Sequence, residues 1–168
     1  MLDAVLRGDY QNWHGLSPEP TLEEFALSIG PAVIQPPRQR DRIATKYSVF
    51  TIERGAPPTR LEAWSPIGTG RISIVEIDDP VCPDIEPVLE AMGEPETVLE
   101  DRRLSLDYLV SEFVFAQRGI VLSVGKPLPS PVSRGRKLLH VRLFVPVTLQ
   151  RYISGIGEPN PSVPEVHR

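Results

Sequence analysis

The chain has 168 residues, of which 40% are hydrophobic and 24% are charged, ordinary values for a soluble globular protein. This length accommodates one medium domain or two very small ones. The formal net charge is −4, whereas phosphate binding needs a concentrated basic surface, so nucleic acid is not the expected partner. The single cysteine, Cys82, excludes an intrachain disulfide and a cysteine-based zinc site.

The sequence contains no apolar run near the roughly 20 residues that span a bilayer. Its first residues lack the long apolar segment and the small-residue cleavage site of a secretory signal. We therefore expect a cytoplasmic protein with no membrane partner.

The first predicted helix begins at Thr21 and ends at Gly30. Thr21 and Glu24 have the spacing of a capping box, in which each side chain accepts a hydrogen bond from the backbone of the other. Gly30 tolerates the left-handed backbone of a helix end, and Pro31 prevents continuation of the helix.

Three strands are predicted after a solvated loop over residues 31–45. Alternating apolar and polar residues place them over residues 47–54, 60–64 and 71–78. A second helix is expected over residues 84–92.

An acidic loop follows that helix and contains Glu94, Glu96, Glu100 and Asp101. Three more strands are predicted over residues 108–118, 120–124 and 138–145. Because alternate residues of a strand point to the same face, His140, Arg142 and Phe144 are expected to lie together, opposite Leu139, Val141, Leu143 and Val145.

The helix phrase occurs three times, at residues 21–31, 84–95 and 148–159, with closing glycines at 30, 93 and 157. The strand segments at residues 49–55 and 113–119 are also similar, again about 64 residues apart, and a fixed period indicates a repeated unit. We predict an α+β fold of two tandem helix-plus-antiparallel-sheet repeats of about 64 residues each, closed by a C-terminal helix.

The predicted boundaries follow from this period, with all parts forming one compact unit. They are residues 1–80 for the first repeat with its N-terminal extension, 81–157 for the second repeat and closing helix, and 158–168 for a Pro-rich tail. The closing helix is expected to dock through Leu149, Tyr152, Ile153 and Ile156.

This order of elements resembles the beta-lactamase inhibitor protein family, and a single unit resembles the BamE-type outer-membrane lipoprotein fold. Residues 89–96 and 116–122 are similar to segments of uncharacterised bacterial proteins of this type. The resemblance implies a sheet with one face covered by helices and an opposite, concave face that grips another protein. The single cysteine and the missing signal segment depart from the inhibitor family, so no partner or contact residue is carried over.

No arrangement of a nucleophile, a base and an orienting group is recognisable in the sequence. The histidines, His14, His140 and His167, are scattered, and Cys82 precedes Pro83 and is interpreted as a structural residue. Asp78, Asp79, Asp84 and Glu86 are interpreted as a solvated turn, with a Mg²⁺ or Ca²⁺ site as the alternative. We expect no cofactor, no metal and no enzymatic activity.

The predicted contact residues are large or charged side chains on strand faces opposite the helices. They are Trp64, Glu62, His140, Arg142 and Phe144, because aromatic residues and arginine are typical interface anchors. Glu94, Glu96, Glu100 and Asp101 are predicted to meet a basic partner. The alternative for Trp64 and Phe144 is packing in a core between the repeats.

These features favour a protein-binding module, in its most concrete form a bacterial immunity or inhibitor protein that neutralises a toxin with a basic surface. One alternative is an adaptor or chaperone-like protein of a secretion apparatus, which would bind several clients. The other is an enzyme with a pocket between the repeats. A polar cleft there with close, buried carboxylates or histidines would favour the enzyme.

Overall fold

The computed structural model describes residues 19–30, 32–36, 47–54, 59–78, 85–105, 108–127 and 136–156. Cys82, the third histidine at position 167 and the predicted tail over residues 158–168 lie outside the described residues. Within the described residues, no helix is long and apolar enough to cross a membrane.

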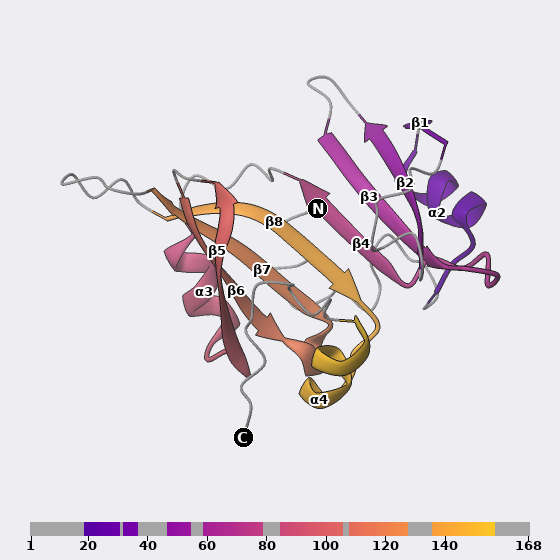
Figure 1. The fold of residues 1–168 in the computed structure, drawn as a ribbon. Coiled ribbons are helices and arrows are strands. Elements are labelled where there is room, and N and C mark those ends of the chain that lie inside the picture. Colours follow the sequence, from indigo (N-terminus) through magenta and orange to yellow (C-terminus); the bar gives the residue numbers. More distant parts are fainter. Residues whose placement is uncertain are drawn as a thin grey trace.

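Eight strands form one antiparallel sheet in the order β1-β2-β3-β4-β8-β7-β6-β5 (Figure 1). The strands are β1 (Ala32–Ile34), β2 (Tyr47–Arg54), β3 (Thr59–Pro66), β4 (Ile74–Asp78), β5 (Thr97–Ser105), β6 (Tyr108–Phe115), β7 (Ile120–Pro127) and β8 (Lys137–Phe144). Strands β1 to β4 form one meander and β5 to β8 form another. The two meanders meet where β4 pairs with β8.

The helices are short. They are α2 (Leu22–Ile29), α3 (Glu86–Met92) and α4 (Leu149–Arg151), which continues as a π-helical segment over Tyr152–Ile156. Figure 1 shows α2 beside the β1–β3 end of the sheet, α3 beside the β5–β7 end, and α4 at one end of β8.

The predicted fold class is wrong. The protein has a mainly β fold built on one continuous sheet, instead of two helix-plus-sheet repeats. The two meanders each end in an apolar strand, and the backbone groups along β4 and β8 bond to each other across five residue pairs. An unpaired strand edge leaves backbone donors and acceptors unsatisfied, so this pairing stabilises a single sheet.

Two segments predicted as loops are strands at the edges of the sheet. β1 lies within the predicted loop over residues 31–45, and β5 contains Glu100 and Asp101 of the predicted acidic loop. Charged residues and flanking prolines are common on edge strands, because they discourage pairing with other chains. Because such residues interrupt the alternation of apolar and polar side chains, the sequence pattern did not predict β1 and β5 as strands.

The N-terminal cap of α2 is confirmed. The Thr21 Oγ1 accepts from the Glu24 backbone N–H (3.2 Å), and Glu24 Oε2 accepts from the Thr21 N–H (2.8 Å). Gly30 and Gly93, which follow α2 and α3, have φ angles of 83° and 75°. Both values lie in the region that favours glycine, as the helix stops predicted.

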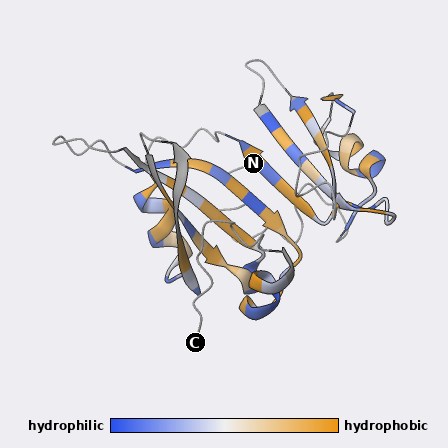
Figure 2. Cartoon of the chain, in the orientation of Figure 1, coloured by the Kyte–Doolittle hydropathy of each residue, from blue (hydrophilic) through white to orange (hydrophobic). Residues whose placement is uncertain are grey.

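The larger hydrophobic cluster lies between the sheet and helices α2 and α3. Phe25 of α2 and Val88 and Met92 of α3 pack in the same cluster as Ile52, Leu61, Val75, Ile77, Leu122, Val141 and Leu143. Figure 2 shows the alternation along β3, β4 and β8 that separates this apolar face from the other. One core therefore runs through both meanders.

A smaller cluster lies on the opposite face, at the end of the sheet next to α4. It contains Trp64, Ile74, Phe144 and Tyr152 among its buried residues. The Tyr152 ring stacks on that of Phe144 at 5.2 Å. Tyr152 thus docks the closing helix as predicted, whereas Ile153 is 51% exposed and does not. The Ile156 side chain lies outside the described residues.

Candidate functional site

Charged side chains gather on the sheet face opposite α2 and α3, which we call the charged face. The β4–β8 register places Glu76 opposite Arg142 and Asp78 opposite His140. The β3–β4 register places Glu62 opposite Glu76. Directly opposed residues project to the same face, so residues far apart in the sequence meet at the seam between the meanders.

Arg142 is the centre of the buried part of this face. Its Nε and Nη2 lie 2.9 and 2.8 Å from Glu76 Oε2, and its Nη1 lies 4.0 Å from Glu112. Burial of the guanidinium opposes its charge, but Glu76 and Glu112 outweigh that effect and raise the pKa of Arg142. The guanidinium also lies over the Trp64 ring, 5.4 Å from its centroid, and within 3.4 Å of the Tyr152 hydroxyl.

His140 and Asp78 form the neighbouring pair. His140 Nδ1 lies 3.1 Å from Asp78 Oδ1, and Asp78 Oδ2 lies 3.3 Å from Arg60 Nε. The hydrogen bond to Asp78 raises the pKa of His140, with help from the charge of Glu76, against burial and the charge of Arg142. Arg60 also donates to Glu62 Oε1 at 3.0 Å.

The charged face becomes more exposed away from α4. There, one residue from each strand forms what we call the outer row. It consists of Val33, Glu53, Arg60, Asp78, His140, Ser123, Glu112 and Leu99. His140 is 34% exposed at its centre, and Val33 and Leu99 are exposed at its ends.

Carboxylates outnumber cations on this face. Among the described residues it carries five carboxylates, Glu53, Glu62, Glu76, Asp78 and Glu112, against the guanidinium groups of Arg60 and Arg142 and the ammonium group of Lys137, which its pairing with Gly125 places on the same face. The excess is two negative charges while His140 is neutral. A surface of this kind attracts cationic groups.

The five strand residues predicted as contacts all lie on the charged face, but at different depths. Trp64 is 2% and Phe144 is 7% exposed, within the smaller cluster, so they are core residues, as the alternative held. Glu62 is 2% exposed. The His140 side chain, 34% exposed, lies in the outer row, whereas the Arg142 side chain, 16% exposed, belongs to the buried part of the face.

The structure describes the side chains of two of the four acidic residues predicted after α3. Glu94 is exposed beyond the end of α3. Glu96 Oε1 accepts from the Gln117 N–H at 2.7 Å, and so holds the start of β5 to the turn after β6. Glu100 and Asp101 lie on edge strand β5, and their side chains lie outside the described set.

Three side chains could hold a metal ion. Ligand atoms of Glu76, Asp78 and His140 lie within 4.8 Å of one another. Both carboxylates are, however, already neutralised by Arg142 and Arg60, which would compete with a cation. In the predicted acidic turn, Glu86 forms a salt bridge with Arg136 at 2.6 Å. Asp79 and Asp84 lie outside the described residues.

Sequence reasoning identified Glu62, His140 and Arg142 but missed the partners that bind them. The signal that could have found these partners is strand parity. It places Glu76, Glu112 and Arg60 on the same face of the sheet as the identified residues. A charged residue within an otherwise apolar strand, such as Glu76 in β4, calls for a partner of opposite charge.

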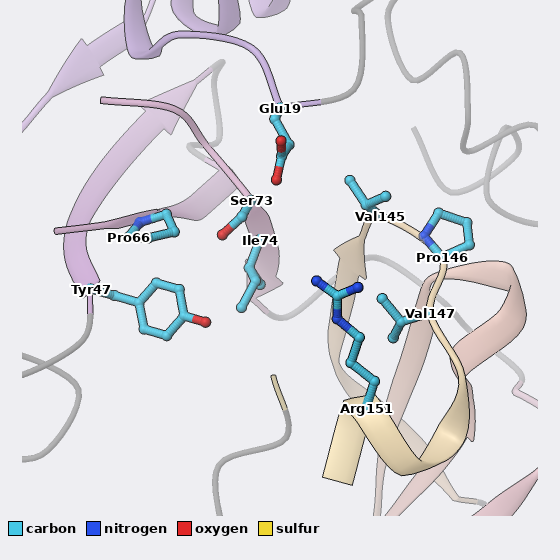
Figure 3. A pocket seen from close by; sticks show the side chains of 9 residues that line it. All are labelled: Glu19, Tyr47, Pro66, Ser73, Ile74, Val145, Pro146, Val147 and Arg151. Atoms are coloured by element: carbon cyan, nitrogen blue, oxygen red, sulfur yellow. The ribbon is translucent and has the colours of Figure 1, made fainter. Parts of the chain in front are cut away.

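A pocket of about 340 Å³ lies at the other end of the seam, near α4. Its lining combines residues of the first meander with the segment that follows β8, and includes Tyr47, Ser73, Ile74, Val147 and Arg151 (Figure 3). None of its described lining residues belongs to the Glu76, Asp78 and His140 group. The pocket and the carboxylate group therefore do not form one site.

Comparison of the chain with protein-family models, with curated proteins and with solved structures gives no match.

Proposed function

We propose that the protein is a binding module that recognises a basic protein through the exposed part of the charged face. The observation that carries this proposal is the outer row, which crosses the whole sheet and combines Glu53, Asp78 and Glu112 with apolar ends. Protein interfaces combine buried apolar groups with polar groups at the rim, and charge complementarity accelerates association.

The charged network supports recognition because it is rigid. Arg60, Asp78 and His140 hold one another through the contacts described above, so the carboxylates are positioned before a partner arrives. Preorganised groups lose less conformational entropy on binding. An immunity or inhibitor protein that blocks a basic toxin, such as a nuclease, is the most concrete form of this function.

The test is co-purification of the chain with the products of its neighbouring genes, because inhibitors are commonly encoded beside their targets. We expect one basic protein to co-purify, with binding that weakens as salt rises. Binding to several related clients would support an adaptor instead, and absence of any protein partner would refute the inhibitor.

A second candidate is an enzyme, favoured by the close group of Glu76, Asp78 and His140 at the seam. The hydrogen bond that His140 Nδ1 donates to the Asp78 carboxylate orients the imidazole, as in general-base sites. Against this candidate, Glu76, Asp78 and His140 do not line the pocket near α4. A screen for hydrolase activity tests this candidate. Activity that is present in the wild type and absent from a His140→Asn variant would favour the enzyme.

A further inference from the structure

The seam pocket carries one positive and one negative side chain that no described residue neutralises. These are Arg151 of α4 and Glu19, which precedes α2. Figure 3 shows the Arg151 guanidinium, the Glu19 carboxylate and the Tyr47 hydroxyl directed into the same space. Among the described residues, Arg151 and Glu19 form no ion pair with each other or with another group.

The backbone holds Arg151 in place. Thr148 Oγ1 accepts from the Arg151 N–H at 3.3 Å and caps α4. The next residue, Tyr152, is buried against Phe144 and anchors the helix. The guanidinium therefore extends from a fixed helix end.

The backbone of Glu19 is held just as firmly. Arg71 Nη1 donates to the Glu19 carbonyl at 3.0 Å, and the Ile72 N–H donates to the Pro20 carbonyl at 2.7 Å. Glu19 also has a φ of 56°, a left-handed backbone conformation that is uncommon outside glycine.

Apolar side chains line part of the space between these charges. Pro66, Ile74, Val145, Pro146 and Val147 line it, and the hydroxyls of Tyr47 and Ser73 add hydrogen-bonding groups. A volume of about 340 Å³ lies at the lower end of the range for small-molecule sites. The ligand that fits is small, apolar along its body and charged at both ends.

We propose that this pocket binds a short peptide with free termini and apolar side chains. Its carboxylate accepts the two parallel hydrogen bonds of the Arg151 fork, and its ammonium group donates to the Glu19 carboxylate. The apolar side chains cover Ile74 and Val147. This inference uses none of the charged side chains of the charged face and does not depend on the proposed function.

The test is isothermal titration calorimetry with three probes: leucyl-leucine, N-acetyl-leucyl-leucine and leucyl-leucine amide. We expect leucyl-leucine to bind about tenfold or more tightly than either blocked form, since each lacks one charged contact. Arg151→Gln should abolish the preference over the amide, and Glu19→Gln the preference over the acetylated form. Glu23→Gln, an exposed residue of α2, is the matched control and should change nothing.

Thermal unfolding of each variant establishes that the fold is intact, and the comparison of probes on the wild type does not depend on any variant. Equal affinity for all three probes, or no binding of leucyl-leucine at millimolar concentration, would overturn the proposal. Equal affinity for the acetylated form alone would also overturn it, because the pocket would then accept any apolar carboxylate.

Discussion

Arg142 binds a single carboxylate oxygen of Glu76 through two of its nitrogens, across the one strand pair that joins the two meanders. Both side chains are largely buried, since they are 16% and 11% exposed. A buried charge without its partner is costly, whereas removal of both charges together costs little. This pair therefore contributes to the choice of register at the seam.

The first prediction concerns that pair. Arg142→Met should lower the free energy of unfolding by about 3 kcal/mol, because it leaves the Glu76 carboxylate buried and unpaired. The double variant Arg142→Met, Glu76→Leu should recover much of the loss. Urea denaturation of the two single variants and the double variant measures the coupling. Additive losses would show that the pair does not act as a unit.

The second prediction concerns pH. The pKa of His140 is raised above its ordinary value of 6.5 in the folded protein, chiefly by its hydrogen bond to Asp78. Its contribution to stability is therefore fully present below about pH 6.5 and is lost as pH rises through the folded-state pKa. His140→Asn keeps a donor for Asp78 but does not titrate.

Urea denaturation between pH 5.5 and about 8.5 should show the wild-type advantage over His140→Asn shrinking as pH rises. The remaining histidines are the same in both proteins, so they cancel in the difference. A difference that stays constant, or that grows with pH, would contradict the assigned pairing of His140 with Asp78.

The third prediction concerns the turn between β6 and β7. Gly119 has a φ of 68°, and a Cβ there would lie 2.0 Å from the Phe144 carbonyl oxygen. Gly119→Ala should therefore cost about 3 kcal/mol or more, through both backbone strain and this clash. Gly68 has a φ of 84° with open space around it, so Gly68→Ala isolates the backbone term at about 1 kcal/mol. If the two variants lose the same unfolding free energy, the predicted clash between residue 119 and the Phe144 carbonyl of β8 does not occur.

Local features of the fold were predictable because short-range physics decides them. Residues 47–54 form β2 as predicted, and Thr21 with Glu24 forms the predicted cap. The parity of His140, Arg142 and Phe144 was also predicted correctly, because a strand fixes which residues share a face.

The fold class was not predictable from the same signals. Whether β4 pairs with β8, or each meander keeps its own sheet, depends on long-range pairing that no single segment encodes. The same limit applies to the site. The sequence placed Trp64 and Phe144 on the correct face, but only the docked Tyr152 shows that they are buried there.

If the charged face binds a basic protein, two variants that each remove two carboxylates, one on that face and one elsewhere, should differ in affinity for the partner. One variant, Glu53→Gln with Glu112→Gln, removes two carboxylates from the outer row. The other, Glu23→Gln with Glu90→Gln, removes two exposed carboxylates from α2 and α3 on the opposite side of the sheet.

The measurement is the dissociation constant of each variant for the co-purifying partner, by surface plasmon resonance at low and at physiological salt. The outer-row variant should bind about tenfold more weakly, mainly through slower association, and the helix variant should match the wild type. Unchanged affinity of the outer-row variant, with loss in the helix variant, would contradict binding through the charged face.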